Sequence, residues 1–424
     1  MYWYHEATKH SYNSVRTNPN QLAWEDQPST YKNYPNSYKK VKLDLEEVED
    51  NFLYHIAGLT EKRTYPSGEY YLRINPSAGA LYPNELYFQV RGVEGKEDGI
   101  YHYEVSSSSL TLLQNINDDE GLEPYFDYKT AMKGYLFLVS AIYYRSSWKY
   151  KNRAFRYCLL DAGHLLGSIE ASALLKPHAV QMVYNIQREK LNCIFGFKER
   201  EWFLAGCSMA VPIHGQEVSA LEFELPYVDG SRTFEKNEII EEVYTETMQL
   251  ENCKRQIKAA KFTYNTDKLK ETIFTRRSQR GFNEGAITKG QFNYIMDVIH
   301  QPILSDCDEA VSVYVVLNRV LNMPLGLYKD GEYIKHGDFA KHAGYLSLEQ
   351  YSLSQQGAMA FFLTSKAKNY QALYQKAGII GHRLYVVAQY MQIGCSGIGA
   401  YYDDEVNEFL GNDEMVLYAL AIGK

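Results

Sequence analysis

The sequence of 424 residues contains no apolar run near the roughly 20 residues that a membrane-spanning helix needs. Its amino terminus, MYWYHEATKHSYNS, also lacks the charged and then apolar order of a secretion signal. These two absences predict a protein that does not enter a membrane and that stays in the cytoplasm.

Basic residues are in the minority, with 44 Lys and Arg against 52 Asp and Glu and a formal net charge of −8. A nucleic-acid surface needs a basic patch, so nucleic acid is not expected as a partner. Hydrophobic residues make up 45% of the chain and charged residues 23%, which is typical of a globular protein with a large buried core.

Cysteine is sparse, and no two of the six cysteines form a C-x-x-C pair. This spacing argues against a zinc site and against a dithiol redox motif, so no metal is expected. We predict reduced, mostly buried thiols at all six positions. These are Cys158, Cys193, Cys207, Cys253, Cys307 and Cys395. Tyrosine, by contrast, is abundant in the first 50 residues, where it is expected to pack that segment onto the body of the protein.

The two halves of the chain share one plan. Asp161-Ala162-Gly163-His164 lies in a long apolar-periodic stretch, and Lys376-Ala377-Gly378-Ile379 lies in another, at an offset of 378 − 163 = 215. The same offset, without gaps, places the stretch from Leu191 to Gly196 on the stretch from Val406 to Gly411. Each half is therefore predicted to contain a long helix followed by a short helix and a terminal strand.

Strand-turn-strand patterns precede both long helices, from Gly99 to Leu113 and from Gly326 to Gly337. Further strands are expected at LYFQV, YLFLVSAIYY, VSVYVVLN and MAFFLTS. The predicted fold class is α+β, with two tandem copies of one unit that form an intramolecular pseudo-dimer. The predicted ranges are 1–235 for the first half, 236–262 for a charged linker that contains a helix, and 263–424 for the second half.

The first candidate binding segment is the basic cluster, Arg276-Arg277-Ser278-Gln279-Arg280. Three arginines and a serine within five residues offer bidentate donors and a hydroxyl group to a phosphate. The alternative interpretation is a solvated basic start of a helix.

The second candidate segment runs from Arg73 to Pro83 and leads into the predicted strand ELYFQV. We call its central part, Pro76-Ser77-Ala78-Gly79-Ala80-Leu81, the proline-serine loop. These residues carry little side-chain bulk, so backbone N–H groups can approach a planar ligand closely. The alternative interpretation is a plain turn before a strand.

The third is the glycine segment, Gly394-Cys395-Ser396-Gly397-Ile398-Gly399-Ala400, at the carboxyl end of the second long helix. Glycine there permits left-handed helix caps and a close ligand. The segment follows a predicted helix and lacks the G-x-S-x-G frame, so it is neither a dinucleotide fingerprint nor a nucleophile elbow. The alternative is a helix cap with a tight turn.

These segments are distributed unevenly between the halves. The first-half counterpart of the glycine segment, Ala179 to Asn185, contains no glycine, and the basic cluster has no counterpart richer than His5 to His10. The proline-serine loop has no counterpart in the second half. Each half lacks at least one of the three segments, so a site built within either half alone would be incomplete. This distribution predicts a single pocket shared by the two halves.

The stretches PSAGALYPNELY, GIYHYE, KYKNRAFRYCLLDAGH and RRSQRGF together resemble the nitroreductase family, specifically its SagB-type dehydrogenase branch in tandem form. The resemblance implies an oxidoreductase that binds FMN and transfers hydride through flavin N5. It implies a small-molecule or peptide substrate and NAD(P)H or another electron donor. It implies FMN contacts from the basic cluster and the last residue (Arg276, Arg277, Ser278, Arg280, Lys424), from the loop (Pro76, Ser77, Ala78, Gly79, Leu81) and from the glycine segment (Ser396, Gly397, Ile398, Gly399).

In azoline-oxidising members of that branch, a Lys-Tyr pair before the long helix is tied to catalysis. Lys149 and Tyr150 occupy this position, and Thr364-Ser365 occupies the matching second-half position. A base beside a hydride transfer would suit such a pair. The alternative is a surface junction without a chemical role.

Two other functions remain open from the sequence. One is a flavin-binding or ligand-binding protein that has lost turnover, and the other is a scaffold in which all three segments are structural. A monomer with an internal pseudo-dimer and a homodimer are both compatible with the sequence.

Overall fold

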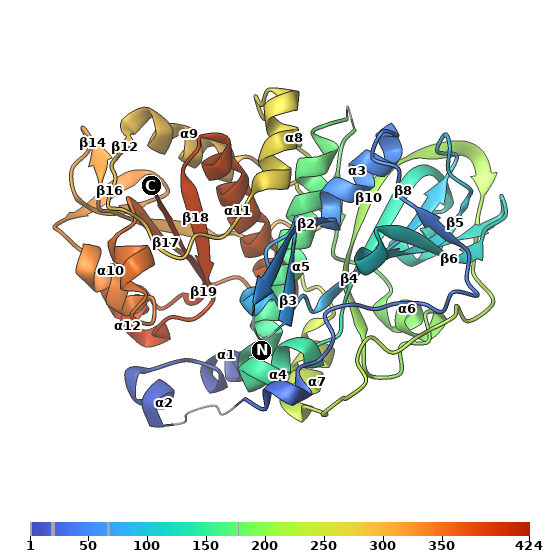
Figure 1. The fold of residues 1–424 in the computed structure, drawn as a ribbon, viewed down its shortest axis with the longest axis horizontal. Helices are drawn as coiled ribbons and strands as arrows, with labels where there is room; N and C mark the ends of the chain where they lie inside the picture. Colours follow the sequence, from blue (N-terminus) through green and yellow to red (C-terminus); the bar gives the residue numbers. More distant parts are fainter. Residues whose placement is uncertain (1, 18–21, 66–67, 177) are drawn as a thin grey trace. The chain divides into compact units, whose positions relative to one another are not determined.

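The computed structural model describes residues 2–17, 22–65, 68–176 and 178–424 (Figure 1). The chain divides into two compact units. The first-half unit comprises Leu22–Ala260 and Pro302–Asp308, and the second-half unit comprises Met1–Gln21, Lys261–Gln301 and Glu309–Lys424. Residues 1–21 thus group with the second half, and residues 302–308 with the first. Among the described helices, none is both long and apolar enough to cross a membrane.

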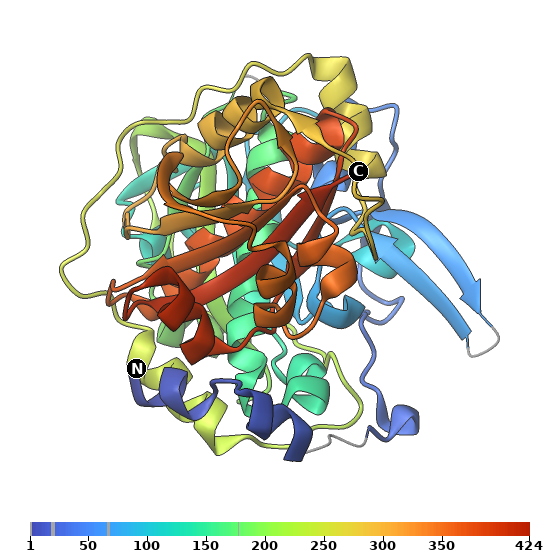
Figure 2. The same cartoon turned by 90° about the vertical axis from the view of Figure 1, so that its left-hand side faces the viewer.

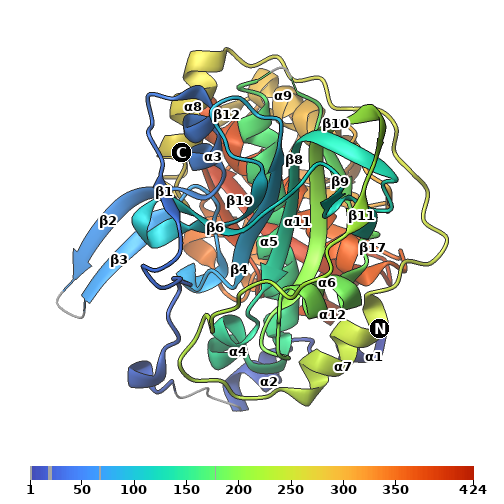
Figure 3. The same ribbon diagram turned by 90° about the vertical axis from the view of Figure 1, so that its right-hand side faces the viewer.

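The first-half unit is built on an antiparallel sheet with the strand order β1-β6-β5-β4-β8-β10-β9 (Figure 3). In that order the strands are β1 (Lys40–Lys42), β6 (Ser109–Asn115), β5 (Gly99–Glu104), β4 (Asn84–Arg91), β8 (Thr130–Ala141), β10 (Trp202–Glu217) and β9 (Gln181–Val183). All residues of β4 and β5 are buried, and their charged side chains Glu85, Arg91 and Glu104 form ion pairs with Arg145, Glu123 and Lys40.

The central helix of this unit, α5 (Ala154–Ala173), contacts β4, β8 and β10. All of its residues except Glu170 are buried, so the helix is enclosed on every side rather than amphipathic. The other main elements of the unit are α3 (Val48–Ala57), the hairpin β2 (Leu59–Tyr65) with β3 (Gly68–Arg73), α4 (Tyr144–Tyr150), α6 (Arg188–Ile194) and α7 (Glu238–Thr247).

The second-half unit is built on an antiparallel sheet with the order β16-β15-β13-β17-β19-β18 (Figure 2). In that order the strands are β16 (Glu332–His336), β15 (Gly326–Lys329), β13 (Ser312–Leu317), β17 (Met359–Ser365), β19 (Met415–Gly423) and β18 (Gly394–Ile398). The long helix α11 (Tyr370–Tyr390) contacts β18 and β19. The other helices include α8 (Thr266–Thr275), α9 (Lys289–His300), α10 (Ala340–Leu346) and α12 (Asp403–Leu410).

The two sheets have the same topology. The order β6-β5-β4-β8-β10-β9 in the first-half unit corresponds strand for strand to β16-β15-β13-β17-β19-β18 in the second. In both units the long helix is followed by an edge strand, a short helix and a long strand in the middle of the sheet. The predicted α+β class and the repeated unit therefore agree with the structure, and β1 is an addition to the first sheet.

Two local predictions meet different outcomes. The linker helix is confirmed as α7, whose N-cap Asn237 accepts a hydrogen bond from the Ile240 N–H at 3.1 Å. The strand predicted for YLFLVSAIYY ends at Ala141, and residues from Tyr144 onward form α4 instead. The apolar run therefore continues past the sheet into a short buried helix, which periodicity alone does not distinguish from a strand.

Tyr4 and Tyr34 near the amino terminus pack as predicted, with 0% and 3% exposure, whereas Tyr12 is 42% exposed. Near Tyr34, Lys32 is buried with its Nζ 2.6 Å from Glu201 Oε2 and 4.2 Å above the Tyr227 ring. A paired buried cation among aromatic rings fixes this segment to the first-half unit.

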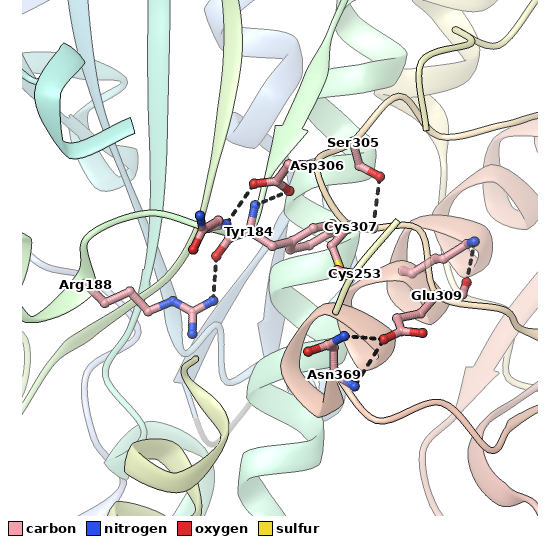
Figure 4. Close-up of a disulfide and its surroundings, with 10 residues drawn as sticks. Tyr184, Arg188, Cys253, Ser305, Asp306, Cys307, Glu309 and Asn369 are labelled. Carbon is pink, nitrogen blue, oxygen red and sulfur yellow. Dashed lines mark hydrogen bonds between the residues drawn. A yellow bond between two sulfur atoms is a disulfide. The ribbon is translucent and has the colours of Figure 1, made fainter. Parts of the chain in front are cut away.

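The expectation of six reduced thiols is wrong for Cys253 and Cys307, which form a disulfide with a Cα–Cα distance of 5.0 Å (Figure 4). Ser305 forms β-bridges with Met182 and Gln256, which brings the segment 302–308 back to the first-half unit. The Asp306 carboxylate adds hydrogen bonds from the N–H groups of Tyr184 and Asn185, both at 2.9 Å. This pairing depends on tertiary structure, so the cysteine spacing gave no sign of it. Cys158, Cys207 and Cys395 are free and buried, and Cys193 is free and exposed.

Thiol titration of the denatured chain is expected to detect four thiols before reduction and six after it. Because the disulfide spans 54 residues, Cys253→Ser is expected to lower the free energy of unfolding by up to about 4 kcal/mol through the added freedom of the unfolded chain. Cys193→Ser is the control, with an expected change near zero. Six thiols in the unreduced protein would contradict the disulfide.

Candidate functional site

The proline-serine loop forms a tight turn directly before β4, with a short helical turn at Ala78–Ala80. Gly79 has φ +62°, and Ala80 follows with φ +54°. Glycine adopts this left-handed conformation without cost, whereas alanine there is strained. The turn that both interpretations of this sequence predicted is therefore present, and its backbone is held in an unusual conformation.

A buried carboxylate holds this loop. The Ser77 hydroxyl donates to the carboxylate of Asp161 on α5, and the Ala78 N–H lies 3.2 Å from both Asp161 oxygens. The Tyr82 N–H donates to Ser77 Oγ at 2.9 Å. The Ala78 N–H is therefore engaged by the protein itself, so the expectation that it faces a ligand is wrong for this group. Asp161 was not among the predicted site residues, although a carboxylate flanked by apolar residues in a helix is a usable signal.

Asp161 is 4% exposed, and burial raises its pKa to about 7, with the hydrogen bonds from Ser77 and Ala78 opposing the increase. The folded protein therefore retains a proton that the unfolded chain releases at lower pH. Stability from this group is present below the unfolded pKa and is lost as the pH rises toward the folded pKa.

We expect the difference in unfolding free energy between the wild type and Asp161→Asn to fall by about 1.4 kcal/mol per pH unit between roughly pH 4 and 7. Denaturant titrations of both proteins across this range measure it. The control is Asp50→Asn, because Asp50 is also 4% exposed and accepts a hydrogen bond from a backbone N–H, but its charge is paired with Lys96. If the difference in unfolding free energy between the wild type and Asp161→Asn does not change with pH, Asp161 is ionised across the whole pH range measured.

The Lys-Tyr pair meets the proline-serine loop at Gly79. Lys149 and Tyr150 end helix α4. A Cβ atom on Gly79 would lie 2.6 Å from the Tyr150 hydroxyl and 3.2 Å from Lys149 Nζ, so only glycine leaves room for the pair. The Tyr150 ring lies 4.3 Å from the ring of Tyr157 on α5. Two motifs that are distant in the sequence are thus brought into one cluster, and the pair is half-buried.

Burial shifts the two candidate catalytic groups in opposite directions. It lowers the pKa of Lys149, and it raises the pKa of Tyr150, with Tyr157 and Asp161 adding to the increase. The lysine is therefore more readily a neutral amine than an exposed lysine, and the tyrosine remains a neutral phenol. Lys151, the next residue, has φ 48° and ψ −135°, a strained conformation of the kind found at functional sites.

The basic cluster follows the carboxyl end of α8, so its interpretation as the start of a helix is wrong. It runs beside the edge strand β18, with a bridge between Ser278 and Cys395. Arg276 is 4% exposed and lies 5.1 Å from the Tyr385 ring, whereas Ser278 and Arg280 are exposed. Arg277 Nη1 donates to the carbonyl groups of Phe274 at 3.0 Å and Arg276 at 2.6 Å, which stabilises the end of the helix.

The glycine segment is an edge strand, β18, rather than a helix cap. Helix α11 ends at Tyr390, and the left-handed residue after it is Gln392, with φ 57°. A Cβ on Gly397 would overlap the Tyr418 hydroxyl, so this glycine is required by packing within the protein. The prediction of left-handed glycines is therefore wrong here, because the turn comes earlier than expected.

Tyr385 of α11 joins the glycine segment to the basic cluster. Its hydroxyl accepts a hydrogen bond from the Gly397 N–H at 2.6 Å and lies 2.9 Å from Ser278 Oγ. Burial raises the pKa of Tyr385 to about 12, so it remains neutral. No sequence pattern singles out this residue, since a tyrosine in an apolar helix is most often part of the core.

The carboxyl-terminal residue lies near the same cluster. The Asn283 N–H donates to the Lys424 carbonyl at 2.6 Å, and the Lys424 side chain is exposed. Burial and the charge of Arg276 lower the pKa of His382 to about 3, so His382 is neutral and Arg276 carries the buried positive charge. Ser396 and Ile398 are buried in β18, and Gly399 follows directly after that strand.

The predicted site residues therefore form two clusters. Pro76 to Leu81, Lys149 and Tyr150 gather in the first-half unit, together with Asp161. The basic cluster, the glycine segment and Lys424 lie in the second-half unit, where Tyr385 joins the first two.

The chain has the nitroreductase-like α+β fold. A solved structure described as a nitroreductase from Anabaena variabilis aligns with 100% of this chain and 99% of its own, with a TM-score of 0.82 and 24% sequence identity. At this identity the similarity shows the fold.

Residues 273–424 match the model of the Nitroreductase family, so the chain contains a nitroreductase-family domain. A curated relative, named as a nitroreductase of Methanocaldococcus jannaschii, is 28% identical over 134 residues, or 31% of this chain. The chain spans 64% of the length of that relative. A chain of the Escherichia coli microcin synthetase McbBCD complex is 16% identical and covers 48% of this chain and 84% of its own, with a TM-score of 0.31, which is too low to support an argument.

Proposed function

We propose that this protein is an FMN-dependent oxidoreductase that transfers hydride through flavin N5. The nitroreductase-family domain at 273–424 and the fold of the whole chain support this general class. The observation that carries the proposal is the meeting of the Lys-Tyr pair with the small-residue loop at Gly79. A loop with only a structural role does not require a lysine of lowered pKa beside Gly79, its exposed residue.

The donor groups of the second-half unit fit a flavin phosphate. Guanidinium groups form charge-assisted, bidentate hydrogen bonds with phosphate oxygens, and Arg276 and Arg280 offer such groups. Ser278 has one hydrogen bond with Tyr385, and a hydroxyl group can form further bonds to a ligand. The Arg277 side chain caps α8, so we assign the phosphate to Arg276, Ser278 and Arg280, with Lys424 as an additional cation.

One FMN shared by both halves is the second part of the proposal. The phosphate-binding residue types occur in the second-half unit, whereas the proline-serine loop and the Lys-Tyr pair occur in the first. Neither unit contains both sets, although the sheets have the same topology. Pro76, Ser77, Gly79 and Leu81 would thus contact the ring from one half, and Ser396, Gly397, Ile398 and Gly399 from the other.

Bound FMN supplies a two-electron acceptor. In the chain itself, Lys149 Nζ is suited to take a proton from the substrate, because burial favours its neutral form. Tyr150 retains its phenolic proton and can donate a hydrogen bond to the substrate. The crowding at Gly79 fixes both groups relative to the loop.

The finer proposal is a SagB-type dehydrogenase that oxidises an azoline in a peptide. It rests on the Lys149-Tyr150 pair and on its contact with the loop. A smaller quinone or nitro substrate, with NAD(P)H as electron donor, is the broader form of the same activity. We further propose a cytoplasmic protein that functions as a monomer or a homodimer.

The decisive experiment is the flavin stoichiometry of the purified chain. We expect one FMN per chain, released by denaturation and quantified by its absorbance, and reduction of this flavin by NADH or NADPH in a stopped-flow instrument. Two FMN molecules per chain would contradict the shared site. Bound flavin that no hydride donor and no azoline peptide reduces would favour a flavin-binding protein without turnover, and absence of flavin binding would favour a scaffold.

A further inference from the structure

We propose that Asp161 is a positioning residue of the flavin site, whose carboxyl group holds the proline-serine loop in the conformation that places Gly79 against Lys149 and Tyr150. This inference rests on the proposed function and deepens it. Asp161 would act through the loop rather than by touching the substrate.

A single side chain fixes both ends of the loop. Asp161 accepts hydrogen bonds from the Ser77 hydroxyl and from the Ala78 N–H at 3.2 Å. Ser77 Oγ accepts the N–H of Tyr82 at 2.9 Å, so the far end of the loop is tied to the same carboxyl group through Ser77. Asp161 itself lies on α5, which is enclosed on nearly all sides and offers a rigid support.

The loop needs such a support because its backbone is strained. Ala80 has φ 54° and Tyr82 has φ 45°, and residues other than glycine hold these conformations only when neighbouring contacts impose them. Without Asp161, the turn is free to relax toward ordinary backbone angles. Gly79 lies between the strained residues and the Lys-Tyr pair, so such a relaxation would alter the spacing between Gly79 and Tyr150.

The loop is also expected to respond to pH. An ionised Asp161 accepts from both Ser77 and Ala78, whereas a protonated Asp161 carries a donor of its own. Asp161 raises the pKa of two neighbouring groups, Tyr150 from α4 and Cys158 on α5. Burial raises the pKa of both, so both are neutral in the neutral pH range, where Asp161 itself changes charge.

The first experiment does not depend on flavin. In a chain with isotope-labelled alanine, the amide proton shift of Ala78 is followed by NMR across the neutral pH range, with Ala78→Gly used to assign the signal. We expect this shift to titrate with a midpoint near 7 in the wild type and to be independent of pH in Asp161→Asn. A wild-type signal that does not titrate, or one that titrates equally in the variant, would overturn the inference.

The second experiment uses the FMN-loaded protein. Asp161→Asn is expected to retain flavin like the wild type, because the residues assigned to the phosphate and to the ring are untouched. We expect the pH dependence of the wild-type flavin absorbance spectrum to disappear in Asp161→Asn, and the rate of flavin reduction to fall several-fold in Asp161→Ala with partial recovery in Asp161→Asn.

Asp50→Asn is the matched control, since Asp50 has the same exposure and lies on α3. A spectrum and a rate in Asp161→Asn and Asp161→Ala that equal those of the wild type would refute the positioning role. A wild-type chain that binds no FMN would instead refute the proposed function, and the Ala78 titration would still decide whether Asp161 controls the loop.

Discussion

Replacing Arg276 and Arg280 together by alanine is expected to abolish retention of FMN during purification. A charge-assisted hydrogen bond contributes about 1.5–3 kcal/mol, so each arginine accounts for a loss of roughly 10-fold to 100-fold in affinity. Fluorescence titration of the apoprotein with FMN measures the dissociation constants. Because Arg280 is exposed, Arg280→Ala alone should weaken binding without affecting folding.

The control for these arginines is Lys341→Ala, which removes an exposed positive charge from α10 of the same unit. Its FMN affinity should equal that of the wild type. Since Arg276 is buried, the thermal unfolding of each variant is to be measured alongside. A folded double variant with unchanged flavin content would show that the basic cluster does not bind the phosphate.

Lys149→Ala is expected to slow single-turnover oxidation of a thiazoline-containing peptide by about 10²-fold to 10⁴-fold, the usual contribution of a general base. Tyr150→Phe should have a smaller effect, because it removes a hydrogen bond and not the base. Both variants should retain FMN and should be reduced by NAD(P)H at rates close to that of the wild type, since this step needs no proton acceptor. Stopped-flow spectroscopy of the flavin follows both reactions.

The adjacent exposed lysine supplies the matched control. Lys151→Ala removes the same charge one residue beyond the pair and retains a non-glycine residue at the same strained position. Equal losses of oxidation rate in Lys149→Ala and Lys151→Ala would show that the rate depends on nearby positive charge in general. Lys149 would then not be a specific base. A wild-type flavin that NAD(P)H reduces and the thiazoline peptide does not would reject the SagB branch and leave the broader oxidoreductase proposal standing.

The sequence predicted the repeated architecture well because it depends on local patterns. The offset of 215 between the two Ala-Gly pairs places α5 on α11 and α6 on α12, and the strand-turn-strand patterns correspond to β5-β6 and β15-β16. Helical periodicity and turn residues are properties of short segments, and a shared pattern in two halves reinforces each assignment.

The glycine segment shows where such patterns fail. Gly394 to Ile398 follows a helix in the sequence, and glycine after a helix is typical of a left-handed cap. In the structure Gln392 makes the turn, and the glycines lie in β18 because Tyr418 leaves no space for a side chain at Gly397. Glycine is required at this position because of a contact with β19, and the local sequence pattern does not reveal that contact.

The sequence by itself determined the order of helices and strands, the duplication and the residue types able to bind a phosphate, because these are written in periodicity and in composition. Tertiary structure alone decided that Asp161 holds Ser77, that Lys149 and Tyr150 lie at Gly79, and that Cys253 meets Cys307. Each of these contacts joins segments that are far apart along the chain, and their distances are set by how helices and strands pack.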